Sequence, residues 1–326
     1  MIDHILQKYP AISNGISYSN QIIENLRKDL KTYLDTMGLG AVISIVITGS
    51  FGRKEASSNS DLDYFIIYKT EESREKVSSN ETSTEISNII KKHVPKEPGS
   101  TGTFGSDASK LSALSENIGG ANESNKDLTR RLLLILEGDW IYGENTFNEA
   151  REGLAEKYLE SYSAGKVPKF FLNDIIRYHR TIAVDFEQKV ANGKGWGLRN
   201  VKLRLSRKML YFGGLIAATE LIDFDENRRK TELLEIIKKP AIERICFYGS
   251  CNETSQKILE VYDKFLEKIE SAKIRLELDN LERCRREDSD VFKELRSLGE
   301  IMTQECIRWI ENRHKDKPEL IGHLIF

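Results

Sequence analysis

Apolar and polar positions follow two different periods in the first part of the chain. Over residues 19–37 the apolar side chains recur at every third or fourth position, which predicts an amphipathic helix. Residues 41–48 and 62–68 are short runs of mostly β-branched and aromatic residues, which predict two buried strands. The polar segment between these strands predicts a short helix over 50–56 and then a turn. Another amphipathic helix is expected from the low seventies to His93.

The pattern changes twice further along the chain. Residues 99–125 are rich in Gly, Ser and Asn, which predicts a loop around one short strand near 101–105. From residue 127 the apolar period is helical, and helices are expected over 127–143, 150–163, 168–190, 197–220, 228–248, 253–285 and 289–313. The expected fold is therefore α+β, with a small domain of mixed sheet and helices over 1–140 and an all-helical domain over 141–326.

Composition narrows the class of protein. The 326 residues are 39% hydrophobic and 31% charged, which suits a globular chain with a sizeable core. No apolar run reaches the roughly 20 residues of a membrane-spanning helix, and the first ten residues lack a signal-peptide pattern. We therefore expect a cytoplasmic protein without a membrane partner. The four cysteines form no CxxC pair, so they predict small buried or half-buried side chains in helices rather than a zinc site.

The near-neutral net charge hides a basic segment. Residues 166–208 contain eleven Lys and Arg against three acidic residues, in a chain whose formal net charge is −2. Such a local excess of positive charge favours a phosphate-bearing ligand.

Two acids stand at the start of the second predicted strand, in the sequence Ser60-Asp61-Leu62-Asp63. Residues two apart in a strand point the same way, so Asp61 and Asp63 should project together. Two adjacent carboxylates repel each other unless a cation lies between them, and Mg²⁺ prefers carboxylate and phosphate oxygens. The pair therefore predicts a Mg²⁺ site, with Mn²⁺ as an alternative.

The first predicted strand ends in Gly49-Ser50. A glycine allows a ligand to approach the backbone closely, and the N–H groups of a helix that starts at Ser50 would favour a phosphate. A phosphate site beside a metal site predicts chemistry on a nucleoside triphosphate (NTP), with ATP among the candidates.

The segment "GSFGRKEASSNSDLD" resembles the signature of the polymerase β-like nucleotidyltransferase superfamily. Its Arg53 and Glu55 are most similar to the minimal, kanamycin and PII-uridylyltransferase types of catalytic domain. The resemblance covers about residues 20–110. It implies that Gly49 and Ser50 hold the β- and γ-phosphates and that Asp61 and Asp63 bind the metal ions. It also implies a third catalytic carboxylate on a later strand, for which Asp107 is the acidic candidate.

Several basic residues have two interpretations. Arg53 could hold the triphosphate or pair locally with Glu55, while Lys54 is expected in solvent. In the basic segment the candidates for binding the triphosphate or nucleic acid are Arg177, Arg180, Lys202 and Arg207, against the alternative of a solvated basic face. Tyr178 and Trp196 are candidates for stacking on a base, or for core positions.

The predicted function is transfer of a nucleoside monophosphate (NMP) from an NTP to an acceptor hydroxyl, with release of pyrophosphate. The basic segment favours RNA or protein as the acceptor. A small molecule such as an antibiotic, or a second nucleotide, is an alternative acceptor, and a non-catalytic nucleotide sensor is an alternative function. The long amphipathic region 253–313 predicts either a helical bundle or a homodimer contact.

Overall fold

Two compact units make up the chain. The computed structural model describes residues 7–97, 104–160, 165–317, 320 and 322–323. One unit, here the sheet unit, is Gly15–Glu160, and the other, here the helical unit, combines Met1–Asn14 with Ser161–Phe326. The expected α+β fold is confirmed, because a mixed sheet with helices is followed by a helical region. The division falls after Glu160 rather than at 140, and the roles expected for the two domains stay predictions.

The sheet has four strands in the order β3-β2-β1-β4. Its members are β1 (Ile43–Thr48), β2 (Asp63–Tyr68), β3 (Ala108–Lys110) and β4 (Asp139–Tyr142). The central strand β1 pairs antiparallel with both β2 and β4, whereas β2 and β3 run parallel. The two expected strands are therefore neighbours at the centre of the sheet.

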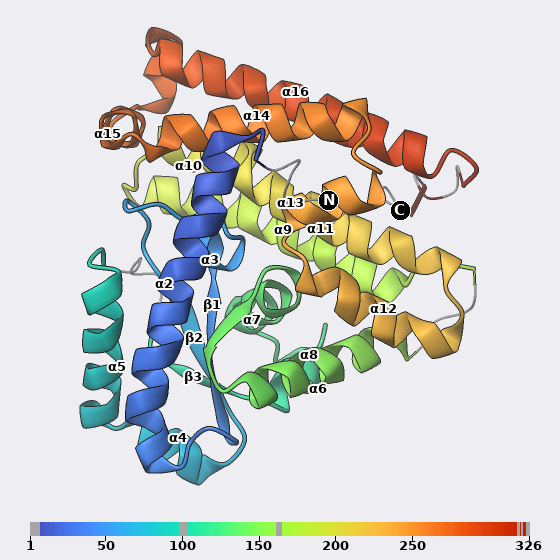
Figure 1. Cartoon of the computed structure of the whole chain (residues 1–326). Helices are drawn as coiled ribbons and strands as arrows, with labels where there is room; N and C mark the ends of the chain where they lie inside the picture. Colours follow the sequence, from blue (N-terminus) through green and yellow to red (C-terminus); the bar gives the residue numbers. More distant parts are fainter. Residues whose placement is uncertain (1–6, 98–103, 161–164, 318–319, 321, 324–326) are drawn as a thin grey trace. The chain divides into compact units, whose positions relative to one another are not determined.

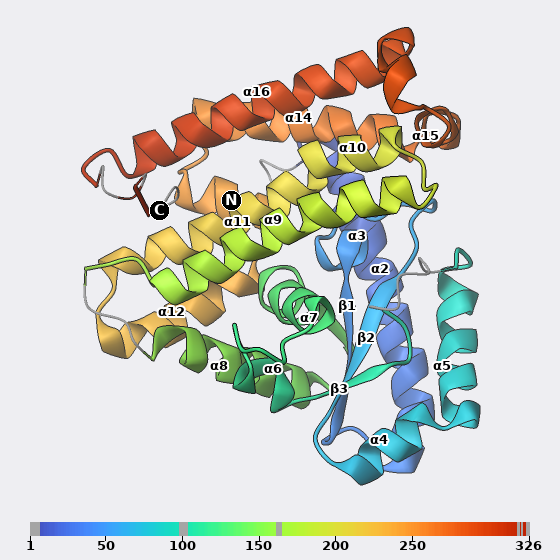
Figure 2. The same cartoon turned by 180° about the vertical axis from the view of Figure 1, so that it is seen from behind.

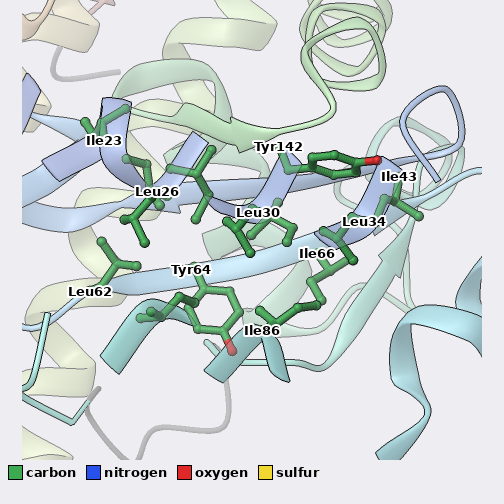
Figure 3. Packing of buried hydrophobic residues seen from close by; sticks show 14 of the residues in the cluster. Ile23, Leu26, Leu30, Leu34, Ile43, Leu62, Tyr64, Ile66, Ile86 and Tyr142 are labelled. Carbon is green, nitrogen blue, oxygen red and sulfur yellow. The ribbon is translucent and has the colours of Figure 1, made fainter. Parts of the chain in front are cut away.

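The core of the sheet unit lies between one face of this sheet and two helices, α2 (Pro10–Leu34) and α5 (Asn80–His93). Alternate residues of β1 and β2 point into it, and Figure 3 shows them against the apolar side of α2. Leu26, Leu30, Leu34, Ile43 and Ile66 are all completely buried. The apolar side of the helix expected from the sequence therefore packs against the inward-facing residues of the two expected strands.

The opposite face of the sheet is covered by α7 (Asn125–Leu136) and α8 (Glu144–Leu159), as Figures 1 and 2 show. Side chains alternate along a strand, so Thr48, Asp63 and Phe65 face this side. The Arg130 guanidinium of α7 lies 5.4 Å from the centre of the Phe65 ring.

Short helices connect these elements: η1 (Asp35–Met37), α3 (Gly49–Gly52), α4 (Glu71–Ser78) and α6 (Ala113–Glu116). The single helix expected before His93 is two helices, because Ser79 leaves helical geometry and its side chain accepts the Thr82 N–H as an N-cap. The helix expected over 50–56 is only the turn α3, since Lys54 adopts a positive φ of 61°.

The largest departure from the sequence prediction lies at 127–143. Instead of one long helix, α7 ends at Leu136, and after Glu137 and Gly138 the chain enters β4. The strand pairs with β1, which the local apolar period did not reveal. The short strand expected near 101–105 lies partly outside the described residues, and its described end is not a strand; β3 begins at Ala108.

The helical unit contains α9 (Lys169–Ala191), α10 (Gly197–Arg204), α11 (Ser206–Glu220), η2 (Leu221–Asp223), α12 (Glu226–Lys238), α13 (Ala241–Tyr248), α14 (Glu253–Glu270), α15 (Ala272–Asp279), η3 (Arg283–Asp288) and α16 (Asp290–Arg313). Three expected helices are interrupted, at Leu205, Pro240 and Ser271. Figure 1 shows α14 and α16 side by side. The start of α2 also belongs here, since the Asp263 carboxylate accepts the Ile12 N–H at 2.9 Å.

Among the helices that the structure describes, none has both the length and the apolar character needed to span a membrane. Cys246 and Cys306 are buried and Cys251 is half-buried, as expected, and all four cysteines are free thiols. The expectation is wrong for Cys284, which is exposed because η3 has no buried residues.

Candidate active site

The turn after β1 brings Gly49 against the second acid. Gly49 has a φ of 68°, in the left-handed region that favours glycine. A Cβ at this position would lie 2.9 Å from Asp63 Oδ2. Thr48 and Asp63 are directly opposite each other in the β1–β2 pair. The structure therefore places the Gly49-Ser50 turn beside the Asp63 carboxylate.

Asp61 and Asp63 lie on the same side of the chain. Ser60, Leu62 and Tyr64 are buried, with exposed fractions of 5%, 1% and 4%, while both acids are half-buried. Leu62 and Tyr64 belong to the core under α2, so the acids point away from it. Asp61 precedes β2, which begins at Asp63. Among the described residues, none donates a hydrogen bond to the Asp61 carboxylate.

A buried hydroxyl lies on the same face of the sheet as Asp63. Thr48 is completely buried, and its Oγ1 has no hydrogen-bond partner in the part of the chain that the structure describes. Its register opposite Asp63 places it on the same face as that carboxylate. A buried hydroxyl without a partner costs free energy unless a ligand satisfies it.

Arg53 pairs with two acids. Its guanidinium lies 2.5 Å from Glu55 Oε1 and 2.6 Å from Glu137 Oε2, and only 7% of its side chain is exposed. Of the two interpretations of Arg53, the local ion pair with Glu55 is the one present in the structure. A role in holding the triphosphate stays a prediction.

Glu137 is a residue of this site that the sequence analysis missed. Its Oε1 accepts the Gly49 N–H at 2.7 Å, and 1% of its side chain is exposed. The sequence predicted a single helix over 127–143, so Glu137 was not recognised as a residue of the site. The signal available in the sequence was the pair Glu137-Gly138, between an apolar helix and a run of strand-forming residues.

Lys54 is not in solvent as expected. Its Nζ lies 2.6 Å from Asp139 Oδ2, and 15% of its side chain is exposed. Asp139 also pairs with Arg27 at 2.9 Å. Asp139 is the first residue of β4, a strand that was not predicted from the sequence. The ion pair between Lys54 and Asp139 was therefore not expected.

Asp107 lies immediately before β3. Lys126 Nζ is 2.7 Å and Arg130 Nη2 is 3.5 Å from its carboxylate. Burial raises the pKa of Asp107, but the hydrogen bond from Lys126 and the positive charge of Arg130 outweigh that effect and lower the pKa below its usual value. In the described ranges, no three or more His, Cys, Asp or Glu side chains are grouped to hold a metal ion. The structure therefore does not group Asp107 with Asp61 and Asp63.

The other predicted basic residues all belong to the helical unit. Arg177 pairs with the buried Asp174 at 2.7 Å, one turn earlier on α9. Arg180 is exposed, while Lys202 and Arg207 are half-buried. Their roles in binding a nucleotide or nucleic acid stay predictions.

The two candidates for base stacking are buried in the helical unit. Tyr178 is 4% and Trp196 is 7% exposed. The Trp196 ring lies 5.0 Å from the Phe292 ring, between centroids. Both side chains therefore occupy core positions, which was the alternative interpretation.

The comparisons with known proteins concern the first part of the sheet unit. Residues 23–100 match the family model of the nucleotidyltransferase domain. The matched residues contain β1, the Gly49-Ser50 turn and both acids, and the match supports the polymerase β-like nucleotidyltransferase superfamily. Asp107 and Glu137 lie beyond the matched residues. A search among curated proteins found no match.

Proposed function

We propose that this protein is a Mg²⁺-dependent nucleotidyltransferase that moves an NMP from an NTP to an acceptor hydroxyl and releases pyrophosphate. The observation that carries the proposal is the close approach of the Gly49 backbone to the Asp63 carboxylate, which leaves no room for a Cβ, with Asp61 on the same side. The family match supports NMP transfer in general. The Arg53 and Glu55 positions favour the minimal, kanamycin or PII-uridylyltransferase type. The cytoplasmic location remains an expectation from the sequence.

The residues present fit a hard divalent cation. Asp61 and Asp63 supply oxygen ligands, and Asp61 receives no hydrogen bond from the described residues that would compete with a cation. The unpartnered Thr48 hydroxyl adds a polar atom on the same face. When bound, Mg²⁺ or Mn²⁺ would neutralise negative charge on the triphosphate and on the leaving pyrophosphate.

The chain's own residues would contribute positioning and charge. Asp61 and Asp63 would hold the cation, and the Gly49-Ser50 turn, which carries no side chain at Gly49, would admit the phosphates. The acceptor oxygen then bonds to the α-phosphorus as the bond from that phosphorus to the bridging oxygen breaks. The acceptor proton passes to a base, and pyrophosphate leaves. Asp107, our candidate third carboxylate, has a lowered pKa and would be a weak base near neutral pH.

RNA or protein is the favoured acceptor. The basic segment 166–208 supports this choice, because Arg180 on α9 is exposed and Lys202 and Arg207 are half-buried. If RNA is the acceptor, its affinity should fall steeply as the salt concentration rises. A small molecule or a second nucleotide should show little salt dependence.

A nucleotide sensor is the second candidate function, and one observation favours it. Asp107 is paired with Lys126 and Arg130 rather than grouped with the two acids. A protein without a third carboxylate could bind an NTP and not transfer it. Intact Asp61 and Asp63 argue for catalysis, because binding a nucleotide does not by itself require that pair.

The direct test is transfer of label from each α-³²P-labelled NTP in the presence of Mg²⁺ and cell extract. Loss of the label with RNase would identify an RNA acceptor, loss with protease a protein acceptor, and label in a small product one of the alternatives. NTP binding without incorporation of label would support the sensor.

A paired variant tests the residues. Asp61→Asn with Asp63→Asn should lower the rate of transfer by at least about 10²- to 10³-fold, because charge stabilisation at the phosphates is lost. The matched control is Glu75→Gln with Glu81→Gln, two exposed acids on α4 and α5 of the same unit. Unfolding by urea should be unchanged in both. Full activity in the Asp61 and Asp63 variant would refute the proposal.

A further inference from the structure

The buried carboxylate of Glu137 binds the Gly49-Ser50 turn through hydrogen bonds. Glu137 lies between α7 and β4, and each of its two oxygens has a partner on the turn after β1. Oε1 accepts the Gly49 N–H at 2.7 Å, and Oε2 accepts from Arg53 Nη1 at 2.6 Å. Hydrogen bonds to a charged acceptor are short and strong, and these two fix the turn at its beginning and its end.

The backbones of the two segments are also in close contact. A Cβ at Gly52 would lie 2.5 Å from the Glu137 carbonyl oxygen, so only glycine fits there. The segment that carries Glu137 is itself held by Arg151 of α8, which donates to the Leu134 carbonyl at 3.0 Å and to the Gly138 carbonyl at 2.6 Å. Glu137 is therefore attached to a well-supported backbone.

A second ion pair joins the same two segments. Lys54, whose φ is positive, binds Asp139, the first residue of β4. Burial raises the pKa of Asp139, but the charges of Lys54 and Arg27 outweigh this and lower it. Asp139 is therefore ionised near neutral pH, and the turn after β1 is fixed to residues 137–139 at three points.

This arrangement is not explained by stability alone. A buried ion pair gains little net free energy, because both charges lose their hydration, and an apolar replacement can be equally stable. What the Glu137 pair provides is a fixed orientation for the peptide of Gly49, at a position where an added Cβ would lie 2.9 Å from Asp63 Oδ2. Reactions that depend on alignment of phosphates are sensitive to small displacements of the groups that hold them.

We propose that Glu137 is a positioning residue for nucleotidyl transfer: with Arg53 it fixes the Gly49-Ser50 turn at the distance from Asp63 that the reaction needs. This inference rests on the proposed function. It assigns Arg53 to the turn rather than to the triphosphate. Glu137 lies outside the residues that match the nucleotidyltransferase domain, so the match does not assign it a role.

The test compares two buried carboxylates of the sheet unit. Glu123 also pairs with a buried arginine, Arg131, at 2.5 Å, and 7% of its side chain is exposed. Its other oxygen accepts the Gly119 N–H at 3.2 Å. The variants are Glu137→Gln, Glu137→Ala and, as the matched control, Glu123→Gln. The glutamine at 137 retains the size and one acceptor, so it keeps the test usable if the alanine variant does not fold.

The first measurement is amide hydrogen exchange at Gly49, which does not depend on activity. Loss of the charged acceptor should speed exchange at Gly49 by about tenfold or more in Glu137→Ala, less in Glu137→Gln, and not at all in Glu123→Gln. Unchanged exchange at Gly49 in Glu137→Ala would overturn the inference.

The second measurement separates kcat from KM for the NTP. We expect kcat to fall by about 10- to 100-fold in Glu137→Gln with a smaller change in KM, while Glu123→Gln keeps the wild-type kcat even if it unfolds at lower urea. Equal kcat in all variants of an active enzyme would overturn the positioning role alone. An inactive wild type would refute the proposed function instead, and Gly49 exchange would still test the Glu137 contact.

Discussion

At the residue scale, the site depends on atoms that leave little freedom for substitution. Gly49 must adopt a φ of 68° and must leave room for Asp63 Oδ2. Gly49 therefore lies between two carboxylates: its N–H donates to Glu137, and its Cα side lies against Asp63. These contacts explain why a glycine stands between a buried strand and the acids.

Replacing Gly49 by alanine tests this residue directly. We expect Gly49→Ala to destabilise the protein by about 1–2 kcal/mol through the left-handed backbone alone, and to displace Asp63 and lower transfer as well. Gly38→Ala is a matched control, because Gly38 has the same φ of 68° and an added Cβ there would meet no atom within 4 Å. Urea unfolding and label transfer would be measured for both. Equal transfer by the two variants would contradict the contact with Asp63.

At the scale of single elements, ends of helices decide much of the structure. The end of α7 at Leu136 creates the segment that carries Glu137. The end of α16 at Arg313 places the buried His314 3.7 Å from the buried carboxylate of Glu220. Burial lowers the pKa of His314 to about 4, and the positive charges of Arg313 and Lys317 act in the same direction. Burial raises the pKa of the neighbouring Glu220. This helix end is therefore sensitive to pH.

The His314 shift predicts a loss of stability in acid. Between pH 6.5 and about 4 the unfolded chain binds a proton at His314 and the folded chain does not, so the free energy of unfolding falls as the pH falls. The raised pKa of Glu220 stabilises the folded protein as the pH falls, which opposes the effect of His314. The effect of His314 is therefore isolated by comparing the wild type with a variant that lacks this histidine. Wild type should lose more stability between pH 7 and 5 than His314→Gln, by up to about 1.4 kcal/mol per pH unit. An NMR titration of His314 with a midpoint near 6.5 would contradict this prediction.

At the scale of the whole molecule, the chain forms two units, each with its own buried residues. The core of the sheet unit is built from residues between Ile23 and Tyr142, all of them inside Gly15–Glu160. A unit of this size buries roughly two-thirds of the surface of its unfolded chain, which is enough for independent folding. The boundary after Glu160 also keeps β4 and α8 with the sheet.

Two fragments test this boundary. A fragment of residues 10–160 should unfold in one cooperative transition, followed by circular dichroism on heating. A fragment of residues 10–140, which follows the boundary expected from the sequence, cuts β4 after Trp140 and removes Arg151, so it should lack that transition. Cooperative unfolding of the shorter fragment at the same temperature would show that β4 and α8 are dispensable.

The sequence by itself determined the centre of the sheet and its acids. Strand periodicity, the break at Gly49 and the spacing of Asp61 and Asp63 are local properties of the sequence. Because side chains alternate between the two faces of a strand, a spacing of two residues predicts that both acids point the same way. The match of residues 23–100 to the nucleotidyltransferase domain covers this same part of the chain.

Only the tertiary structure decided what lies around that centre. Strand β4 looked helical because its pairing with β1 is made across the chain and leaves no local period, and Glu137 meets Gly49 over a separation of 88 residues. Asp107 is held by Lys126 and Arg130, and Lys54 by Asp139, through contacts that no spacing rule encodes. Local sequence patterns determine the secondary structure of a segment. The ion pairs of its charged side chains are determined only when the folded backbone brings distant segments together.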